Sequence, residues 1–261
     1  MRHRAESFGG VAAAYAEYRP SYPDEAVQWL VGTSPGRVLE LGAGTGALTT
    51  RLSSLGHEVI ATDPSVDMLG HLRAALPQAR VMVARAESIA LPSSAVDIVA
   101  AAQAFHWFDR DRALFEIARV LRPGGVLALV WNSADRKVPW VKRVFDLIDV
   151  VEDDSLGDPV EGSDLFATSD RRAFRHWQRF HRASLLGFVA SSSRAATMTP
   201  DERAALFEEV GKLYDSYGRG PDGMLMPWHT RCYRARVSGL VNAARPDDAD
   251  GYDDTLLVDF S

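Results

Sequence analysis

Three glycines at alternate positions, Gly42, Gly44 and Gly46, follow a short apolar segment and precede leucines at helical spacing. Glycine lets the backbone turn sharply and lets its N–H groups approach a ligand with no Cβ in the way. The loop therefore predicts a binding site in which main-chain groups contact the ligand. A glycine-rich turn that binds nothing is the other interpretation.

The spacing of these glycines separates the loop from two common nucleotide-binding turns. A dinucleotide-binding turn has its last glycine one residue later, and a P-loop continues with lysine, whereas Ala47 follows Gly46. Asp63 ends the next β-rich segment, 21 positions after Gly42. An acid about 20 residues beyond such a loop can hydrogen-bond ribose hydroxyls. The loop and Asp63 together predict a nucleoside site, although Asp63 could instead cap the following helix.

A second cluster of aromatic and polar side chains follows the apolar segment 95–101. Because open parallel sheets bind ligands at the carboxyl ends of their strands, this cluster is predicted to hold the second substrate. Three roles are open to His106 within it: a base, a hydrogen-bond donor to a substrate carboxylate, or a packed residue that holds the loop. No metal site is predicted, because His106 has no partner at ligand spacing. The cluster consists of Gln103, Phe105, His106, Trp107 and Phe108.

The elements that must position these loops alternate along the chain. Apolar, β-rich segments are separated by segments of helical spacing, which is typical of a doubly wound α/β sheet. The late part of the chain is predicted to insert helices that roof the active site. The expected strands are 37–41, 58–63, 80–84, 95–101, 126–131, 173–181 and 224–237, and the expected late helices are 138–151, 184–189 and one that starts at a capping box over 199–202.

The segment from Glu40 to Gly46, Glu-Leu-Gly-Ala-Gly-Thr-Gly, closely resembles the first motif of the class I S-adenosylmethionine (SAM) dependent methyltransferases. Residues 102–109, Ala-Gln-Ala-Phe-His-Trp-Phe-Asp, resemble a motif of the small-molecule branch that includes trans-aconitate methyltransferase-like, or methyltransferase type 11, proteins. The resemblance runs from about Phe8 to Trp131 and weakens beyond. It implies a Rossmann-like, doubly wound seven-stranded α/β sheet with an N-terminal lid and a helical insertion late in the chain.

The same resemblance implies SAM as the cofactor and S-adenosylhomocysteine (SAH) as its product. His106 is the candidate catalytic residue, with orientation of the acceptor as its expected role. The predicted cofactor-binding residues are Tyr15, Arg19, Glu40, Gly42, Ala43, Gly44, Gly46, Asp63, Pro64, Met68, Ala86, Glu87 and Gln103. The predicted substrate-binding residues are Tyr22, Phe105, His106, Trp107, Trp131 and Trp140. Met68 could instead be a core residue, the lid could be a helix packed on the core, and Trp131 and Trp140 could close the end of the sheet.

The chain of 261 residues suits one α/β domain with an elaboration. We expect a lid at 1–30, a methyltransferase domain at 31–245 and an acidic tail at 246–261. Within the domain, 31–131 is the SAM-binding half and 132–245 the acceptor half. The net charge of −6 argues against nonspecific nucleic-acid binding. No segment approaches the ~20 apolar residues of a membrane span or forms a signal peptide, so a cytoplasmic monomer or homodimer without a membrane partner is expected.

The predicted reaction is methyl transfer from SAM to a small-molecule acceptor by in-line displacement. We expect methylation of an oxygen, and a carboxylate is one acceptor class that needs no base. Three alternatives are considered: a SAM-binding regulatory protein without activity, an NAD(P)-dependent oxidoreductase, and a methyltransferase with a macromolecular substrate. The glycine spacing argues against the second, and the acidic balance of the chain argues against the third.

Overall fold

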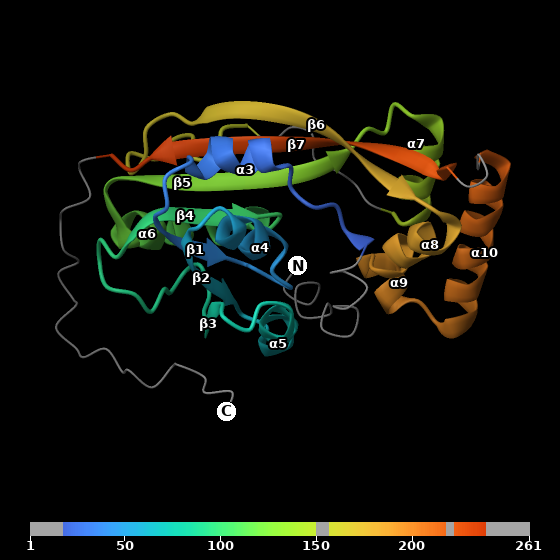
Figure 1. Cartoon of the computed structure of the whole chain (residues 1–261), viewed down its shortest axis with the longest axis horizontal. Helices are drawn as coiled ribbons and strands as arrows, with labels where there is room; N and C mark the ends of the chain where they lie inside the picture. Colours follow the sequence, from blue (N-terminus) through green and yellow to red (C-terminus); the bar gives the residue numbers. More distant parts are fainter. Residues whose placement is uncertain (1–17, 150–156, 218–221, 239–261) are drawn as a thin grey trace.

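A seven-stranded sheet with the strand order β3-β2-β1-β4-β5-β7-β6 forms the centre of the molecule (Figure 1). The computed structural model describes residues 18–149, 157–217 and 222–238. The first five strands run parallel, and β7 pairs antiparallel with both β5 and β6. The predicted doubly wound seven-stranded sheet is therefore confirmed. The strands are β1 (Arg37–Leu41), β2 (Glu58–Asp63), β3 (Arg80–Val83), β4 (Val96–Ala102), β5 (Leu121–Ala134), β6 (Asp170–Phe180) and β7 (Met224–Arg236).

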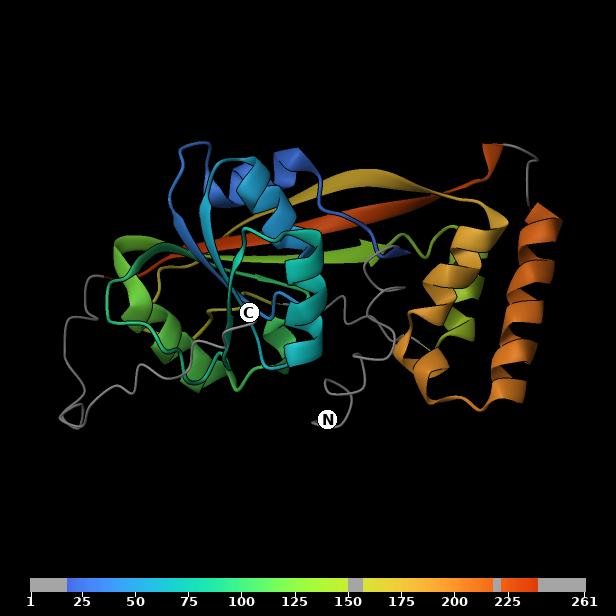
Figure 2. The same cartoon turned by 60° about the horizontal axis from the view of Figure 1, so that its bottom comes forward.

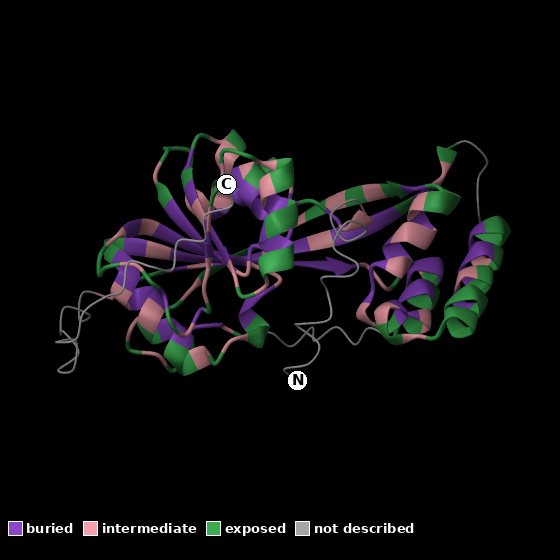
Figure 3. Cartoon of the chain, turned by 90° about the horizontal axis from the view of Figure 1, so that it is seen from below, coloured by how far each residue is buried: buried purple, intermediate pink, exposed green. Residues whose placement is uncertain are grey.

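Helices cover both faces of the parallel strands because alternate side chains of each strand point to opposite faces. The helices α3 (Asp24–Val31) and α4 (Ala47–Ser54) bury their apolar residues against one face, together with Val38, Ala128 and Cys232. The helix α6 (Arg110–Val120) packs against the other face. The helix α5 (Val66–Ala75) packs beside β2 and β3. Figure 3 shows the resulting pattern, with buried strands and helices exposed on their outer sides.

A separate group of helices lies beyond the ends at which β4 and β5 point, as Figures 1 and 2 show. It contains α7 (Pro139–Leu147), α8 (Arg182–Ala190), α9 (Ser193–Thr197) and α10 (Pro200–Tyr217). Their apolar side chains form a second hydrophobic cluster with the ends of β6 and β7. Three of these helices lie between β6 and β7 in the chain, which confirms the predicted late insertion. Among the helices of the described ranges, none combines the length and apolar character needed to cross a bilayer.

Several predicted element boundaries are wrong. β5 begins at Leu121 rather than at 126, β6 spans Asp170–Phe180 rather than 173–181, and α8 spans Arg182–Ala190 rather than 184–189. The strand expected over 126–131 continues to Ala134, because β7 pairs with it as far as Ala134 opposite Trp228. Asn132 therefore lies inside a strand rather than in the loop that the sequence predicts. The helix expected over 138–151 ends at Leu147.

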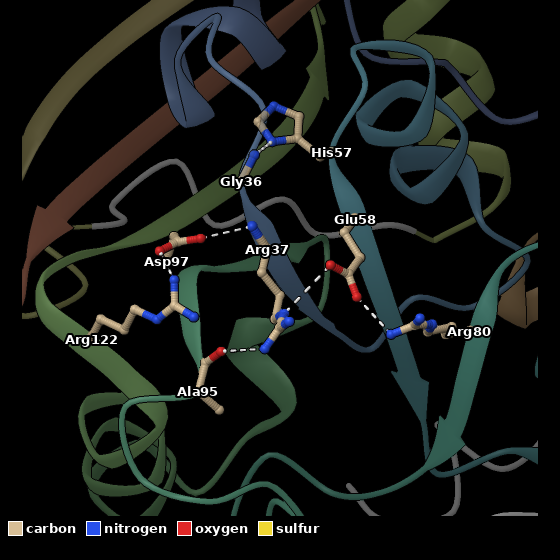
Figure 4. A network of polar contacts seen from close by, with 8 residues as sticks. All are labelled: Gly36, Arg37, His57, Glu58, Arg80, Ala95, Asp97 and Arg122. Atoms are coloured by element: carbon tan, nitrogen blue, oxygen red, sulfur yellow. Dashed lines mark hydrogen bonds and ion pairs between the residues drawn. The ribbon is translucent and has the colours of Figure 1, made fainter.

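A network of ion pairs ties together the amino ends of the parallel strands (Figure 4). Asp97 accepts a hydrogen bond from the main-chain N–H of Arg37 at 2.8 Å and forms an ion pair with Arg122 at 2.7 Å. Glu58 pairs with Arg37 at 3.6 Å and with Arg80 at 2.6 Å. These contacts lie at the edge of the sheet opposite the glycine loop. They hold neighbouring strands together and leave the carboxyl edge for binding.

Candidate active site

The glycine loop joins β1 to α4 at the carboxyl edge of the sheet. Gly42, Gly44 and Gly46 have φ values of 68°, 56° and 89°, which side chains with a Cβ rarely adopt. A Cβ on Gly42 would lie 2.5 Å from the Cβ of Ala104, so the loop packs directly against the segment that follows β4. A Cβ on Gly44 would meet nothing within 4 Å. The close contact requires glycine at position 42, while the open side of Gly44 leaves room for a ligand.

Asp63 connects the glycine loop to the end of β2. Its carboxylate accepts hydrogen bonds from the N–H groups of Gly44 at 3.0 Å and Ser65 at 2.8 Å. Desolvation raises the pKa of Asp63 despite these two hydrogen bonds. Ser65 caps α5 by accepting from the N–H of Met68, so the capping role that the sequence left open for Asp63 belongs to Ser65. A carboxylate has about four acceptor positions, so Asp63 can still accept hydrogen bonds from ribose hydroxyls.

Glu40 is buried in β1 immediately before the loop. It is 1% exposed, and Thr49 of α4 donates its hydroxyl to Oε2 of Glu40 at 2.6 Å. Thr62 of β2 donates to the carbonyl oxygen of Glu40 at 2.8 Å. Burial raises the pKa of Glu40 to about 8, and the charge of nearby Asp63 adds to the effect. Glu40 is therefore largely protonated at neutral pH in the protein without ligand.

The segment after β4 begins with a residue in an uncommon conformation. Gln103 has a φ of 56°, and its side chain donates to the carbonyl of Asn132 at 2.9 Å. The short 3-10 helix η2 (Phe105–Trp107) follows, and Phe105 contacts Phe108 edge-to-face with ring centroids 5.7 Å apart. Phe105 is buried, whereas Trp107 is 44% exposed. This conformation presents the next side chain, His106, at the carboxyl edge.

His106 is held by two tryptophans. Its ring lies 4.7 Å from the ring of Trp107, and Nε1 of Trp131 donates to Nδ1 of His106 at 3.3 Å. Trp131 is itself buried edge-on against Tyr233, with ring centroids 5.6 Å apart. Although part of His106 is exposed, desolvation of the ring lowers its pKa. Of the predicted pair, Trp131 is therefore brought to His106, whereas Trp140 is buried with α8 and α10 in the second hydrophobic cluster.

The turn after β3 is tied to the segment after β4. Glu87 accepts a hydrogen bond from the main-chain N–H of Asp109 at 2.8 Å, and Asp109 caps α6. Ala86 is buried in the hydrophobic cluster that also contains Phe105. Both predicted residues of this turn thus contact the segment that follows β4 or the cluster that contains Phe105.

Comparison with known proteins identifies the family. Residues 39–129 match the family model described as a methyltransferase domain. The chain is 41% identical over 239 residues to an uncharacterized methyltransferase of Mycobacterium tuberculosis, an alignment that covers 91% of this chain and 98% of the relative. This chain belongs to the class I SAM-dependent methyltransferases. The methyltransferase is also similar to a type II methyltransferase structure from Anaeromyxobacter dehalogenans, with a TM-score of 0.64, 26% identity, and coverage of 84% of this chain and 98% of the other.

Family membership implies the use of SAM, and the loop geometry fits this ligand. The open side of Gly44 would leave room for the adenosine, and Asp63 would offer acceptors for the ribose hydroxyls. When bound, SAM supplies a methyl group on a positively charged sulfur. The family also excludes the oxidoreductase alternative. Among the described residues, no group of His, Cys, Asp and Glu side chains is arranged to hold a metal ion.

The remaining predicted residues of this methyltransferase lie in different surroundings. Met68 is buried at the start of α5, and Pro64 is exposed beside it. Tyr22 is buried among the apolar residues of α3 and α4. Arg19 contacts the insertion, where its guanidinium lies 5.2 Å from the ring of Phe188. Tyr15, like the rest of the predicted lid before residue 18 and the acidic tail, lies outside the described residues.

A buried polar group on the sheet was missed by the sequence analysis. Asn132 of β5 and Thr230 of β7 are 6% and 0% exposed, and Thr230 donates to Oδ1 of Asn132 at 2.7 Å. Buried polar groups that are fully hydrogen-bonded hold specific arrangements. The only signal in the sequence was an asparagine directly after a strand, and its pairing with Thr230, 98 positions later, has no local pattern.

Proposed function

We propose that this methyltransferase transfers the methyl group of SAM to an oxygen of a small molecule, with a carboxylate as the preferred acceptor group. The observation that carries the proposal is the hydrogen bond from Trp131 to Nδ1 of His106 at 3.3 Å. An indole N–H can only donate, so Nδ1 must accept and the proton of the neutral imidazole must lie on Nε2. The lowered pKa of His106 favours this neutral form at physiological pH.

This tautomer supports one of the three roles considered for His106. The ring nitrogen that carries a lone pair already accepts from Trp131, so it cannot take a proton from an acceptor without losing that bond. Nε2 carries a hydrogen and can donate it to an oxygen. His106 is therefore suited to hold an acceptor that is already anionic, and a carboxylate meets this requirement at neutral pH.

The reaction then needs no base. One carboxylate oxygen forms a bond to the methyl carbon, the bond from carbon to sulfur breaks, and its electron pair stays on sulfur. The other oxygen can accept from Nε2 of His106. No proton is released, so the contribution of the protein is alignment and exclusion of water, which can be worth about 7–11 kcal/mol. The buried Phe105 and Trp131 beside His106 provide apolar surroundings for this step.

Partial relatives support an oxygen as the methylated atom. The chain is 40% identical over 130 residues to a protein of Methylococcus capsulatus named malonyl-[acyl-carrier protein] O-methyltransferase. That alignment covers 48% of this chain and 46% of the relative. Because the alignment covers about half of each chain, it supports the type of reaction and not the identity of the acceptor.

The decisive experiment is incubation with SAM labelled on its methyl group and a panel of carboxylic acids, phenols, amines and lipids. We expect label in a base-labile methyl ester of a carboxylic acid. Label found only in a phenol ether or an amine would contradict the carboxylate proposal. Asp63→Asn is the control variant: label that is still transferred by this variant does not depend on the cofactor site.

Two variants of His106 test the donor role. His106→Gln keeps an N–H near the position of Nε2, whereas His106→Leu removes it. A hydrogen bond to a charged group is worth about 1.5–3 kcal/mol, so we expect His106→Leu to lower kcat/KM by ~10–100-fold. His106→Gln should retain most of the activity. Equal loss in both variants, or an acidic limb in the pH profile of wild type that His106→Gln lacks, would contradict the donor role.

Trp107 tests whether the exposed aromatic surface belongs to the acceptor site. It is 44% exposed and lies against His106. Trp107→Ala is expected to raise KM for the acceptor and leave the Kd for SAH unchanged. A weaker Kd for SAH with an unchanged acceptor KM would place Trp107 in the cofactor site instead.

A further inference from the structure

The segment that leads into α3, residues 18–21, is here called the entry segment, and separate parts of the molecule hold it. Arg19 donates to Oγ of Ser191, at the end of α8, at 3.2 Å. Arg51 of α4, the helix that follows the glycine loop, donates to Oγ of Ser21 at 3.0 Å. The entry segment thus connects the inserted helices to the cofactor half.

Asn132 lies at the centre of these contacts. Its side-chain nitrogen donates to the carbonyls of Pro20 at 3.3 Å and Ser21 at 3.2 Å. Gln178 of β6 makes a similar contact, donating to the carbonyl of Tyr18 at 3.0 Å. Amides mounted on the sheet therefore bind the backbone of the entry segment, and this attachment does not depend on its side chains.

Hydrogen bonds from Thr230 and His176 fix the orientation of the Asn132 side-chain amide. Thr230 donates its hydroxyl to Oδ1 of Asn132 at 2.7 Å, and the Thr230 oxygen lies 3.2 Å from Nδ1 of His176. Desolvation lowers the pKa of His176, which favours a neutral ring that can donate from Nδ1. The hydrogen bonds then run in one direction, from His176 through Thr230 and Asn132 to the entry segment. A flipped amide would place Oδ1 against two carbonyl oxygens, which repel it.

The main chain of Asn132 contacts the other side of the site. Its carbonyl accepts from the side chain of Gln103 at 2.9 Å, and the N–H of Gln103 donates to the carbonyl of Val130 at 2.9 Å. These two bonds hold Gln103 in its uncommon conformation with a φ of 56°. The next residue, Ala104, packs against Gly42. Asn132 is therefore the common neighbour of the entry segment and the segment after β4.

We propose that Asn132 is a positioning residue for methyl transfer, because its amide, directed by Thr230, holds the entry segment against β5. Ser21 of the entry segment accepts from Arg51 of α4 at 3.0 Å, and α4 begins directly after Gly46 of the glycine loop. Anchoring the entry segment therefore also holds the helix that follows the predicted cofactor loop. The inference rests on the proposed function, since it requires SAM to bind at the glycine loop.

The test compares the Kd for SAH, measured by calorimetry, with kcat and KM in variants of this network. Asn132→Asp replaces the donor with an oxygen that repels the two carbonyls, and we expect the Kd for SAH and the KM for SAM to rise by about tenfold or more. The kcat at saturating SAM should change much less, because the contacts of His106 are untouched. Thr230→Val should raise both constants by a smaller factor, and Thr230→Ser, which keeps the hydroxyl, should behave like wild type.

Cys232→Ala is the matched control for lost stability. Cys232 is buried on the same strand and the same face as Thr230, two residues away, and contributes apolar contacts. The Cys232→Ala variant should have a lower melting temperature and an unchanged Kd for SAH. An unchanged Kd in Asn132→Asp, or an equal rise in Cys232→Ala and Thr230→Val, would overturn the proposal. If Asn132→Asp does not fold, the pair Thr230→Val and Thr230→Ser decides. Failure of wild type to bind SAH would instead refute the proposed function.

Discussion

Asp97 and Asp63 lie at opposite ends of the same parallel sheet and differ in what surrounds their carboxylates. At the amino edge, the N–H of Arg37 and the guanidinium of Arg122 hold the pKa of Asp97 below its usual value (Figure 4). At the carboxyl edge, burial raises the pKa values of Asp63 and Glu40 although both accept hydrogen bonds. The amino edge satisfies its charges internally. At the carboxyl edge, a ligand that donates hydrogen bonds to these buried carboxyl groups would stabilise their charged form.

The largest difference between the edges is expected in cofactor binding. Asp63→Asn places an amide nitrogen against one of the two N–H groups that Asp63 now binds, those of Gly44 and Ser65. We expect the affinity for SAH to fall by ~100-fold, as for the loss of a hydrogen bond to a charged group with added repulsion. Asp97→Asn, the same change at the amino edge, should leave the affinity unchanged. Calorimetry measures the affinity of both variants for SAH, and equal losses of affinity would contradict the difference between the two edges.

The next largest effect is expected from the close contact of the glycine loop. Gly42→Ala puts a Cβ 2.5 Å from the Cβ of Ala104 at a φ of 68°. Overpacking of this kind costs about 1–3 kcal/mol, so we expect SAH affinity to fall roughly tenfold. Adding Ala104→Gly should restore part of the loss by removing the clash. At the amino edge, Gly36→Ala is the matched control, and it should not affect binding.

A smaller effect concerns stability and pH. Glu40 has a pKa of about 8 in the folded protein, whereas the ordinary pKa of a glutamate side chain is 4.5. Between pH 4.5 and pH 8 the Glu40 carboxyl group is deprotonated in the unfolded chain and protonated in the folded protein. The free energy of unfolding of wild type therefore falls as the pH rises towards 8. Glu40→Gln removes the dependence and still accepts from Thr49. We expect it to gain about 1–3 kcal/mol over wild type at about pH 7.5 and little near pH 5, in ligand-free denaturant titrations. A gain independent of pH would contradict the raised pKa.

The smallest effect is expected at the amino edge itself. The side chains of Arg122 and Asp97 are 46% and 39% exposed, and exposed ion pairs contribute about 0–1 kcal/mol. Arg122→Ala should therefore lower stability by less than about 1 kcal/mol and leave activity unchanged. Because the pKa of Asp97 is lowered, its contribution should disappear as pH falls through that pKa. Thermal unfolding at neutral and acidic pH measures this, and a loss of turnover in Arg122→Ala would show that the edges are not independent.

Much of the cofactor half could be predicted because its signals are local. Strand, loop and helix follow one another within a few residues around Gly42, Gly44 and Gly46, so their order in the chain is also their order in space. Glu40 and Asp63 end neighbouring parallel strands, and parallel pairing brings them to one edge. The sequence could not show that Glu40 is buried beneath the loop against Thr49.

The acceptor half was harder to predict because its partners are distant in the chain. Trp131 and Trp140 looked equivalent as residues that flank the polar loop predicted after the fifth strand, yet one contacts His106 and the other is buried with the inserted helices. Arg19, which is predicted to bind the cofactor, contacts Ser191 at the end of α8. Antiparallel pairing with β7 extends β5 past the boundary that its apolar pattern suggested, and Trp131 therefore lies inside a strand rather than at its end.

The amino-acid sequence alone determined the methyltransferase family, the alternating α/β sheet and the glycine loop between β1 and α4, because short-range spacing encodes all three. Only the tertiary structure decided which nitrogen of His106 carries the proton and which side chain anchors residues 18–21. Both depend on β5, where adjacent residues Trp131 and Asn132 point to opposite faces of the sheet and meet partners that no local pattern specifies.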